Sequence, residues 1–448
     1  MRTVVPTVYI RLHMLDSFPC SQARRREPTE YGEMTTESTQ ALYSQKLQRI
    51  TDAIALRRPD RVPTAFNASF WLAKYGGISH RQLMYDYETA QDILRRAIFE
   101  LDPDAYSPPH FTTFIGPTME KLGFRQLQWP GHGVGDHQPY QYLDREYMKA
   151  EEFDEFIADP TGFYLSKYLP RIGSAFEGFE HLPLFPGLHY TRIVTGIRPF
   201  AHPAVRRALS RVIEAAEEAQ KLADYANGFI AEMRQAGYPL LGCTTSMAPY
   251  DFFADYFRGA KGMMTDLYRR RDKLMEAMDK IVPFLLRHAV AAAAASPSKI
   301  VFIPIHWAPD RFMSQDQFKN VYWPSFHRLL LAMIDAGLTP MPLWESECEK
   351  RLEIIGQDVP KGKMIYWFER TDMVRAKAIL GDVVCLRGNI LPPVMNLGTP
   401  AEVDAACRHL IENVGRDGGF ILDGAFGIPD EAPLENVRAL YQSVRKYN

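Results

Sequence analysis

The feature that most constrains the fold of this chain is an alternation of short apolar segments with longer segments of helical spacing. An apolar run of about 4–8 residues is typical of a buried strand, and strands separated by helices pair in parallel through crossover connections. Eight segments fit this description: Val62–Phe66, Asp102–Ser107, Tyr238–Cys243, Lys299–His306, Thr339–Trp344, Met364–Phe368, Val383–Arg387 and Phe420–Asp423. Because eight parallel strands close a (β/α)8 barrel, we predict an α/β fold of the TIM-barrel type.

Helical spacing of apolar residues predicts the segments between these strands. The expected helices are Ser38–Arg57, Ser79–Glu100, Ala204–Gln235, Ala260–Ala294, Gln315–Ala336 with a kink at Pro324, Glu347–Ile355, Thr371–Leu380, Ala401–Val414 and Glu435–Tyr447. Residues 108–171 are rich in Pro, Gly and aromatic side chains and show no long periodic segment until Ala150–Ile157. We therefore expect a long inserted loop region that folds over the barrel mouth.

The first part of the chain has a different character. It combines Arg24, Arg25 and Arg26 with Pro, Ser and Thr, and its apolar residues follow no period. We expect residues 1–37 to be a disordered extension, with Met34 as the natural start, and residues 38–448 to form one barrel domain. A targeting peptide is the alternative, although this segment lacks a sustained apolar core.

Charge and cysteine content exclude several classes of protein. The formal net charge is −2, so no basic field favours nucleic acid or an anionic membrane. The five cysteines are odd in number and widely spaced, which argues against a disulfide framework. The longest apolar stretch, residues 289–295, is too short to span a bilayer. We expect a soluble cytoplasmic protein, and no P-loop or Gly-x-Gly-x-x-Gly motif supports nucleotide binding.

Polar residues follow the expected strands at the ends where barrel enzymes place their catalytic groups. They are Asn67, His306, Asp310, Glu345, Glu347, Glu369, Arg387, Asn389 and Asp423. A carboxylate at the end of a buried strand needs a pocket or a partner, so Glu345 is the main catalytic candidate, with His306 and Asp423 beside it. Glu347 is assigned instead to the acidic start of a helix.

Several further residues are expected to contact a substrate. Arg387 can pair with a substrate carboxylate or form an internal ion pair, and Asn67 and Asn389 lie at the same strand ends. In the inserted region, His132 and His137 flank glycines and precede Tyr140 and Gln141. We expect these four residues to belong to a loop over the substrate, because a metal site at the two histidines would need further ligands.

Four blocks of sequence resemble the uroporphyrinogen decarboxylase-like superfamily. They are Arg58-Pro59-Asp60-Arg61-Val62-Pro63, Asp102-Pro103-Asp104-Ala105, Met313-Ser314 with Tyr322-Trp323-Pro324, and Gly419-Phe420-Ile421-Leu422 through Gly427-Ile428-Pro429 to Pro433-Leu434-Glu435-Asn436-Val437. The resemblance runs from about residue 45 to the end and implies a (β/α)8 barrel. The superfamily holds porphyrinogen decarboxylases and corrinoid-dependent methyltransferases.

The chain departs from both branches. The decarboxylases carry Arg-Gln-Ala-Gly-Arg after the first strand to hold carboxylates, whereas residues 66–71 here contain no arginine. The zinc-dependent methyltransferases carry His-x-Cys and a later Cys at the positions of Trp344, Ser346 and Phe426. Because zinc needs nitrogen, sulfur or oxygen donors, we expect no zinc at the family site and interpret Trp344 and Trp71 as substrate-packing residues.

The resemblance implies methyl transfer from a small organic substrate, aromatic or otherwise, to a corrinoid (cobalamin) carried by a partner protein. Glu345 or His306 would then protonate the leaving atom. The alternatives are a metal-free decarboxylase, in which Arg387 anchors a carboxylate and Asp423 or His306 protonates the carbanion, and a binding protein without catalysis. A homodimer is compatible with the sequence, which does not identify the substrate.

Overall fold

Six parallel strands form the largest sheet of the computed structural model, which describes residues 36–183 and 188–447. Their order is β11 (Phe420–Gly424), β10 (Cys385–Ile390), β9 (Ile365–Phe368), β8 (Thr339–Trp344), β7 (Ile300–Ile305) and β6 (Thr244–Thr245). Two further strands, β1 (Ala65–Asn67) and β2 (Ala105–Ser107), also pair in parallel. Strands β9 and β11 are buried along their whole length, which explains the apolar sequence of β9 and of the first three residues of β11.

Single parallel bridges join the two-stranded sheet to both edges of the larger one. Thr64, before β1, bridges to Leu422 of β11, and Leu422 N donates to Pro63 O at 2.9 Å. Tyr106 of β2 bridges to Leu240, which precedes β6. The predicted strands therefore occur as a continuous series of parallel neighbours, although β6 is shorter than the expected strand Tyr238–Cys243 and begins after it.

One apolar residue from each of these eight strand segments enters a separate buried cluster. The α1 helix (Thr36–Ile54) adds Ile50 and Ala53 to it. The strand residues of the cluster are Ala65, Ala105, Leu241, Ile300, Met341, Ile365, Cys385 and Ile421. The strand segments thus share one buried cluster, and a larger apolar cluster combines residues of the strands and the helices.

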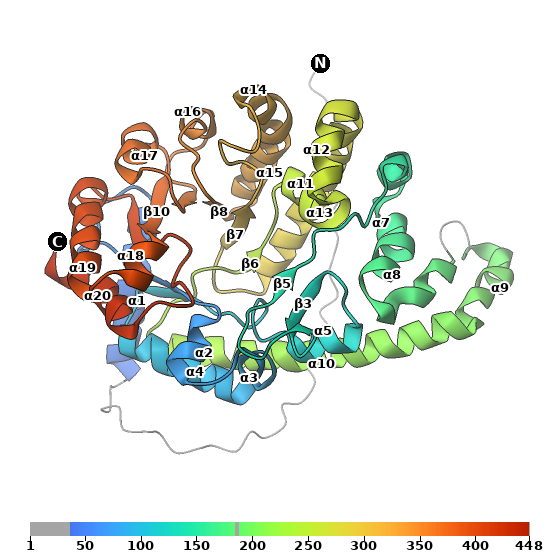
Figure 1. Ribbon diagram of the computed structural model, residues 1–448, viewed down its shortest axis with the longest axis horizontal. Coiled ribbons are helices and arrows are strands. Elements are labelled where there is room, and N and C mark those ends of the chain that lie inside the picture. The colour runs from blue at the N-terminus through green and yellow to red at the C-terminus, as the bar shows by residue number, and fades with distance from the viewer. Residues whose placement is uncertain (1–35, 184–187, 448) are drawn as a thin grey trace. The chain divides into compact units, whose positions relative to one another are not determined.

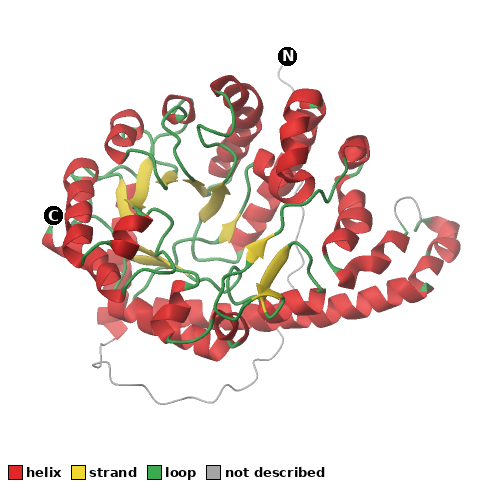
Figure 2. Cartoon of the chain, viewed as in Figure 1, coloured by secondary structure: helices red, strands yellow, loops and turns green. Residues whose placement is uncertain are grey.

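Helices surround the strands, as Figure 2 shows, and most lie where helical spacing predicts them. Their bounds are α2 (Trp71–Gly76), α3 (His80–Tyr85), α4 (Tyr87–Leu101), α10 (Pro203–Gln235), α11 (Pro249–Phe252), α12 (Gly259–Arg269), α13 (Arg271–Ala294), α14 (Gln315–Gln317), α15 (Trp323–Asp335), α16 (Leu352–Ile355), α17 (Met373–Leu380), α18 (Pro392–Leu397), α19 (Pro400–Leu410) and α20 (Leu434–Lys446). Among the described residues, no helix combines the length and the apolar character needed to cross a membrane.

Three predicted helices are interrupted for local reasons. The helix expected from Ser79 to Glu100 breaks at Asp86, whose carboxylate caps α4 by accepting from Thr89 N. The helix expected over Ala260–Ala294 breaks at Arg270. A π-helical segment, Phe318–Tyr322, precedes Pro324 in the expected kinked helix. A proline lacks the backbone N–H of the regular ladder, so a wider turn before it is a common way to continue the helix.

The region predicted as a long loop is largely built from short elements. It contains the sheet β4 (Gly133–Val134), β3 (Leu127–Pro130) and β5 (Gln141–Tyr142), with α5 (Gly116–Leu122), α6 (Phe153–Ala158), α7 (Pro160–Phe163), α8 (Leu169–Ile172) and, further on, α9 (Ile193–Gly196). The periodic segment Ala150–Ile157 corresponds to a 3-10 turn followed by α6, whereas the other elements are too short to show a period and were not predicted. Figure 1 shows α10 running below this region toward α9.

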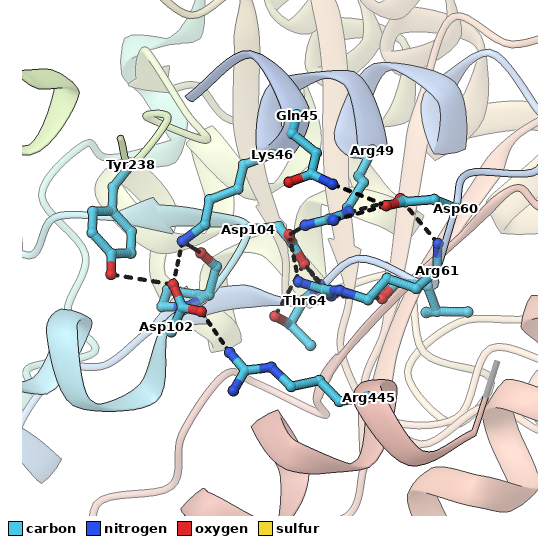
Figure 3. A network of polar contacts seen from close by, with 12 residues as sticks. Gln45, Lys46, Arg49, Asp60, Arg61, Thr64, Asp102, Asp104, Tyr238 and Arg445 are labelled. Atoms are coloured by element: carbon cyan, nitrogen blue, oxygen red, sulfur yellow. Dashed lines mark hydrogen bonds and ion pairs between the residues drawn. The ribbon is translucent and has the colours of Figure 1, made fainter. Parts of the chain in front are cut away.

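A buried carboxylate, Asp104, ties the amino ends of β1 and β2 to α1 (Figure 3). Asp104 is fully buried and accepts hydrogen bonds from Arg49 at 2.9 Å, from Arg61 at 2.7 and 2.9 Å, and from Thr64 N at 2.9 Å. Asp60 holds the other side of the Arg49 guanidinium at 2.7 and 2.8 Å. The network therefore pairs every charge that it buries.

We predict that Asp104→Asn lowers the free energy of unfolding by roughly 3–5 kcal/mol, because two guanidinium groups lose the carboxylate charge that compensates their burial. The control is Asp92→Asn, which removes an exposed partner of Arg95 and Arg96 and is expected to cost about 1 kcal/mol or less. Urea unfolding of both variants measures the difference. Equal losses would contradict the role assigned to Asp104.

Candidate functional site

His306 and Glu345 meet at the carboxyl ends of two neighbouring parallel strands. Ile305 of β7 pairs with Trp344 of β8, so the residues that follow them lie side by side. His306 Nε2 is 3.4 Å from Glu345 Oε1. The structure therefore brings together the two residues that the sequence predicts as catalytic at these strand ends.

Asp255 lies on the other side of the His306 ring. It belongs to the π-helical segment Phe253–Arg258, which continues α11 after β6. Asp255 Oδ2 is 2.6 Å from His306 Nδ1, and Asp255 Oδ1 accepts from Trp307 Nε1 at 2.8 Å. The result is an array, Asp255–His306–Glu345, in which one imidazole lies between two carboxylates.

A second aspartate, Asp251, contacts the backbone of the array. Asp251 Oδ1 accepts from the backbone N–H groups of His306 and Trp307, at 2.5 and 3.2 Å. Asp251 is fully buried, and the hydroxyl of Tyr322 lies close to its carboxyl group without a hydrogen-bonding geometry. Asp251 therefore fixes the backbone that carries the His306 ring.

The charges of the array shift the pKa values of its members. Burial lowers the pKa of His306, but its contacts with Asp255 and Glu345 outweigh burial and raise that pKa to about 11. Burial and the neighbouring Asp255 carboxylate raise the pKa of Asp251 to about 7. At neutral pH the ring is thus an imidazolium, a proton donor held by two acceptors.

The array is reachable from solvent. The side chain of His306 is 37% exposed and that of Glu345 25%, whereas Asp255 is 14% exposed. One tyrosine of the inserted region, Tyr142, lies close enough to Asp255 for two causes to raise the pKa of its phenol: burial first, and then the Asp255 carboxylate. The predicted contact Tyr140 instead packs edge-on against Phe70. The inserted region therefore borders the site.

The sequence does not single out Asp251 and Asp255. The expected strand Tyr238–Cys243 ends before them, and the expected helix Ala260–Ala294 begins after them. Neither aspartate therefore belongs to a predicted element. Their spacing of four residues directly after a strand could have indicated them, because it places two carboxylates on one face of a helical turn.

Asp423 and Arg387 lie in the interior, where they pair with each other. Arg387 Nε and Nη2 donate to Asp423 Oδ2 at 2.9 and 2.5 Å, and the guanidinium lies 3.6 Å from the Trp367 ring centre. Neither side chain is exposed beyond 1%. Burial raises the pKa of Asp423 to about 6, although Arg387 opposes the shift. Both residues are thus occupied by an internal ion pair, the outcome that the sequence left open for Arg387.

The expectation that Trp344 and Trp71 pack against a substrate is wrong, because both side chains are buried in the protein. Trp344 is fully buried among Phe318, Trp323, Phe326 and Tyr366, between β8 and its covering helix. Trp71 is 1% exposed and donates its Nε1 to Ala432 O at 2.9 Å. Side chains alternate along a strand, so the residue before Glu345 faces the opposite side of β8.

The remaining predicted contacts lie apart from the array or have other partners. Asn389 Nδ2 donates to Thr371 O at 2.8 Å, and Asn67 O accepts from Ile428 N at 2.8 Å. His132 stacks on Trp129, and His137 and Gln141 are exposed.

The other acids after the strands also have partners. Glu347 pairs with Arg311 rather than starting a helix, because α16 begins at Leu352. Glu369 accepts from Ser346 N at 2.6 Å, and Asp310 from Lys350 N at 3.0 Å.

We predict that the His306 ring keeps both protons from pH 5 to pH 9 and that Asp255→Asn lowers its pKa by removing a carboxylate. Because the pKa is raised on folding, the stability gained from this charge is complete below about pH 6.5 and is lost as the pH rises toward 11. Ring nitrogen chemical shifts measure the titration, with the resonance identified by its loss in His306→Gln. Loss of a proton below pH 8 would contradict the array.

We also predict that Trp344→Ala lowers the free energy of unfolding by roughly 3–5 kcal/mol, since it leaves a cavity in packed aromatic surroundings. Phe426→Ala, at a side chain 51% exposed, serves as the control and is expected to change stability by about 0.5 kcal/mol or less. Thermal and urea unfolding distinguish the two sites. If Trp344→Ala left the stability unchanged, the packing role of Trp344 would be contradicted and the residue would again be a candidate substrate contact.

Comparison with known proteins places this geometry in a family. Residues 192–447 match the family model of uroporphyrinogen decarboxylase (URO-D). The uroporphyrinogen decarboxylase of Coxiella burnetii (strain Dugway 5J108-111) is 31% identical over 78 residues, 17% of this chain and 21% of that protein. The one of Syntrophotalea carbinolica is 26% identical over 181 residues, 40% of this chain and 50% of that protein. The matches thus span about a fifth to a half of these relatives.

Among solved structures, a methyltransferase from Methanosarcina mazei superposes with a TM-score of 0.57 and 17% sequence identity. The alignment covers 90% of this chain and 98% of that protein. At this identity the likeness establishes a shared fold. The family model covers more than half of the residues, and the chain belongs to the uroporphyrinogen decarboxylase (URO-D) family.

Proposed function

We propose that the chain is a methyltransferase built on a (β/α)8 barrel, which moves a methyl group from a small organic substrate to a corrinoid on a partner protein. The barrel is supported by the parallel bridges at both edges of the six-stranded sheet and by the cluster to which each strand segment contributes one residue. The methyltransferase fold of the structural neighbour supports the same architecture.

The observation that carries the proposal is the His306 ring held between the carboxylates of Asp255 and Glu345 at a solvent-reachable strand edge, a setting that raises the pKa of the ring. When a methyl group leaves as a cation equivalent, the oxygen or nitrogen that held it keeps the bonding pair and needs a proton. His306 Nε2 would supply this proton, and the neutral ring would keep its Nδ1 proton bonded to Asp255. Glu345 would orient Nε2 and the substrate.

The corrinoid, when bound, supplies the nucleophile that receives the methyl group. Exposed apolar side chains on the segments after β7, β10 and β11, namely Phe312, Leu391 and Phe426, suit the apolar surface of such a macrocycle. We do not place zinc at the family position, because Trp344 and Phe426 offer no donor atoms.

Decarboxylation receives less support from the site. The arginine that would anchor a carboxylate, Arg387, is fully buried and bound to Asp423. A carboxylated substrate would have to break that ion pair inside the core, which is unfavourable because Asp423 would lose the cation that compensates its burial. The binding-protein alternative differs from the proposal by the absence of turnover.

We predict that His306→Gln and Glu345→Gln each lower the rate of methyl transfer, by roughly 10²–10⁴ for the proton donor, while the fold is kept. The assay follows the absorbance of reduced cobalamin with methoxylated and methylated aromatic substrates. Glu347→Gln, an exposed carboxylate paired with Arg311, is the matched control and should retain the wild-type rate. Release of CO₂ from carboxylated substrates, or substrate binding without turnover by the wild-type protein, would overturn the proposal.

A further inference from the structure

Three potential metal ligands converge on the inner side of the array. Three residues, Asp251, Asp255 and His306, each offer one ligand atom, and these three atoms all lie within 4.8 Å of one another. Asp251 and Asp255 are four residues apart on one continuous helical segment after β6, while His306 follows β7. Two adjacent strand ends therefore supply two carboxylates and one imidazole to a single point.

Asp251 provides an independent indication that this point receives a ligand. Its Oδ1 is occupied by the backbone N–H groups of His306 and Trp307, whereas its Oδ2 is buried and accepts no hydrogen bond, because the nearby Tyr322 hydroxyl lacks the geometry for one. A buried carboxylate oxygen without a donor is unfavourable, and a second carboxylate beside it adds repulsion. A cation that contacts both carboxylates relieves both costs.

We propose that Asp251, Asp255 and His306 Nδ1 bind one divalent transition-metal ion. Imidazole nitrogen and carboxylate oxygen together suit zinc, manganese, iron and cobalt, with bonds of about 2.0–2.2 Å. The ion takes the place of the proton on Nδ1, which passes to solvent, so the titration predicted above for both ring protons applies to the metal-free chain. The 2.6 Å contact between Nδ1 and Asp255 widens to about 3 Å.

This site differs from the family zinc position, which corresponds to Trp344, Ser346 and Phe426 in this chain. It also leaves Nε2 and its hydrogen on the side of Glu345. The inference therefore goes beyond the proposed function and does not rest on it: metal binding is measured on the protein alone, without substrate or corrinoid.

The test uses the full chain treated with a chelator and then titrated with zinc or cobalt ions. We expect one ion per chain by calorimetry and visible cobalt absorption bands of a nitrogen and oxygen site. Asp251→Asn keeps the size of the side chain and an oxygen for the backbone N–H groups, and should weaken binding at least tenfold. Asp255→Asn provides a second variant in case Asp251→Asn lowers stability, which circular dichroism checks.

Glu369→Gln is the matched control, because it removes a carboxylate at the neighbouring strand end, after β9, outside the three-residue cluster. Its metal affinity should equal that of the wild-type chain. Failure of the wild-type chain to bind one ion would overturn the inference, and so would equal affinity in the wild-type, Asp251→Asn and Asp255→Asn proteins. A failed methyl-transfer assay would leave this result untouched.

Discussion

The parallel pairing of β6, β7 and β8 is the constraint on which the candidate site depends. Parallel strands end at the same edge, so the segments that follow them must share a small volume. The pair Asp251 and Asp255, His306 and Glu345 come from three separate parts of the sequence, and the pairing of the strands makes them neighbours. Their mutual electrostatics, including the raised pKa of His306, follow from that proximity and from partial burial.

Much of the fold could be predicted because strands buried on both faces leave apolar runs, as in β9 and in the last five residues of β8. The inserted region could not be predicted, since its strands of two to four residues and its helices of four to seven are too short to show a period. The break at Asp86 was also missed, although an aspartate before Tyr87 is an ordinary helix cap.

For the candidate site, strand-end reasoning named His306 and Glu345, which the structure brings together, but failed to distinguish the exposed strand edge from the interior. Asp423 and Trp344 satisfy the same sequence rule, yet Asp423 is bonded to Arg387 in the core and Trp344 faces the helices. A strand end can be recognised from sequence within one or two residues, whereas the direction of a side chain reverses with each residue. Asp255 escaped notice because its position depends on an α11 turn continued as a π-helix.

The Asp104 network lies at the amino ends of β1 and β2, while the array lies beyond the carboxyl ends of β7 and β8. The Asp104 network and the candidate site thus lie at opposite ends of the strands. An engineer could therefore exchange the loops around His306 for others, in search of new substrates, without disturbing the ion pairs that hold α1 in place. The molecule is therefore suited to serve as a scaffold in which the segments around the candidate site can be replaced.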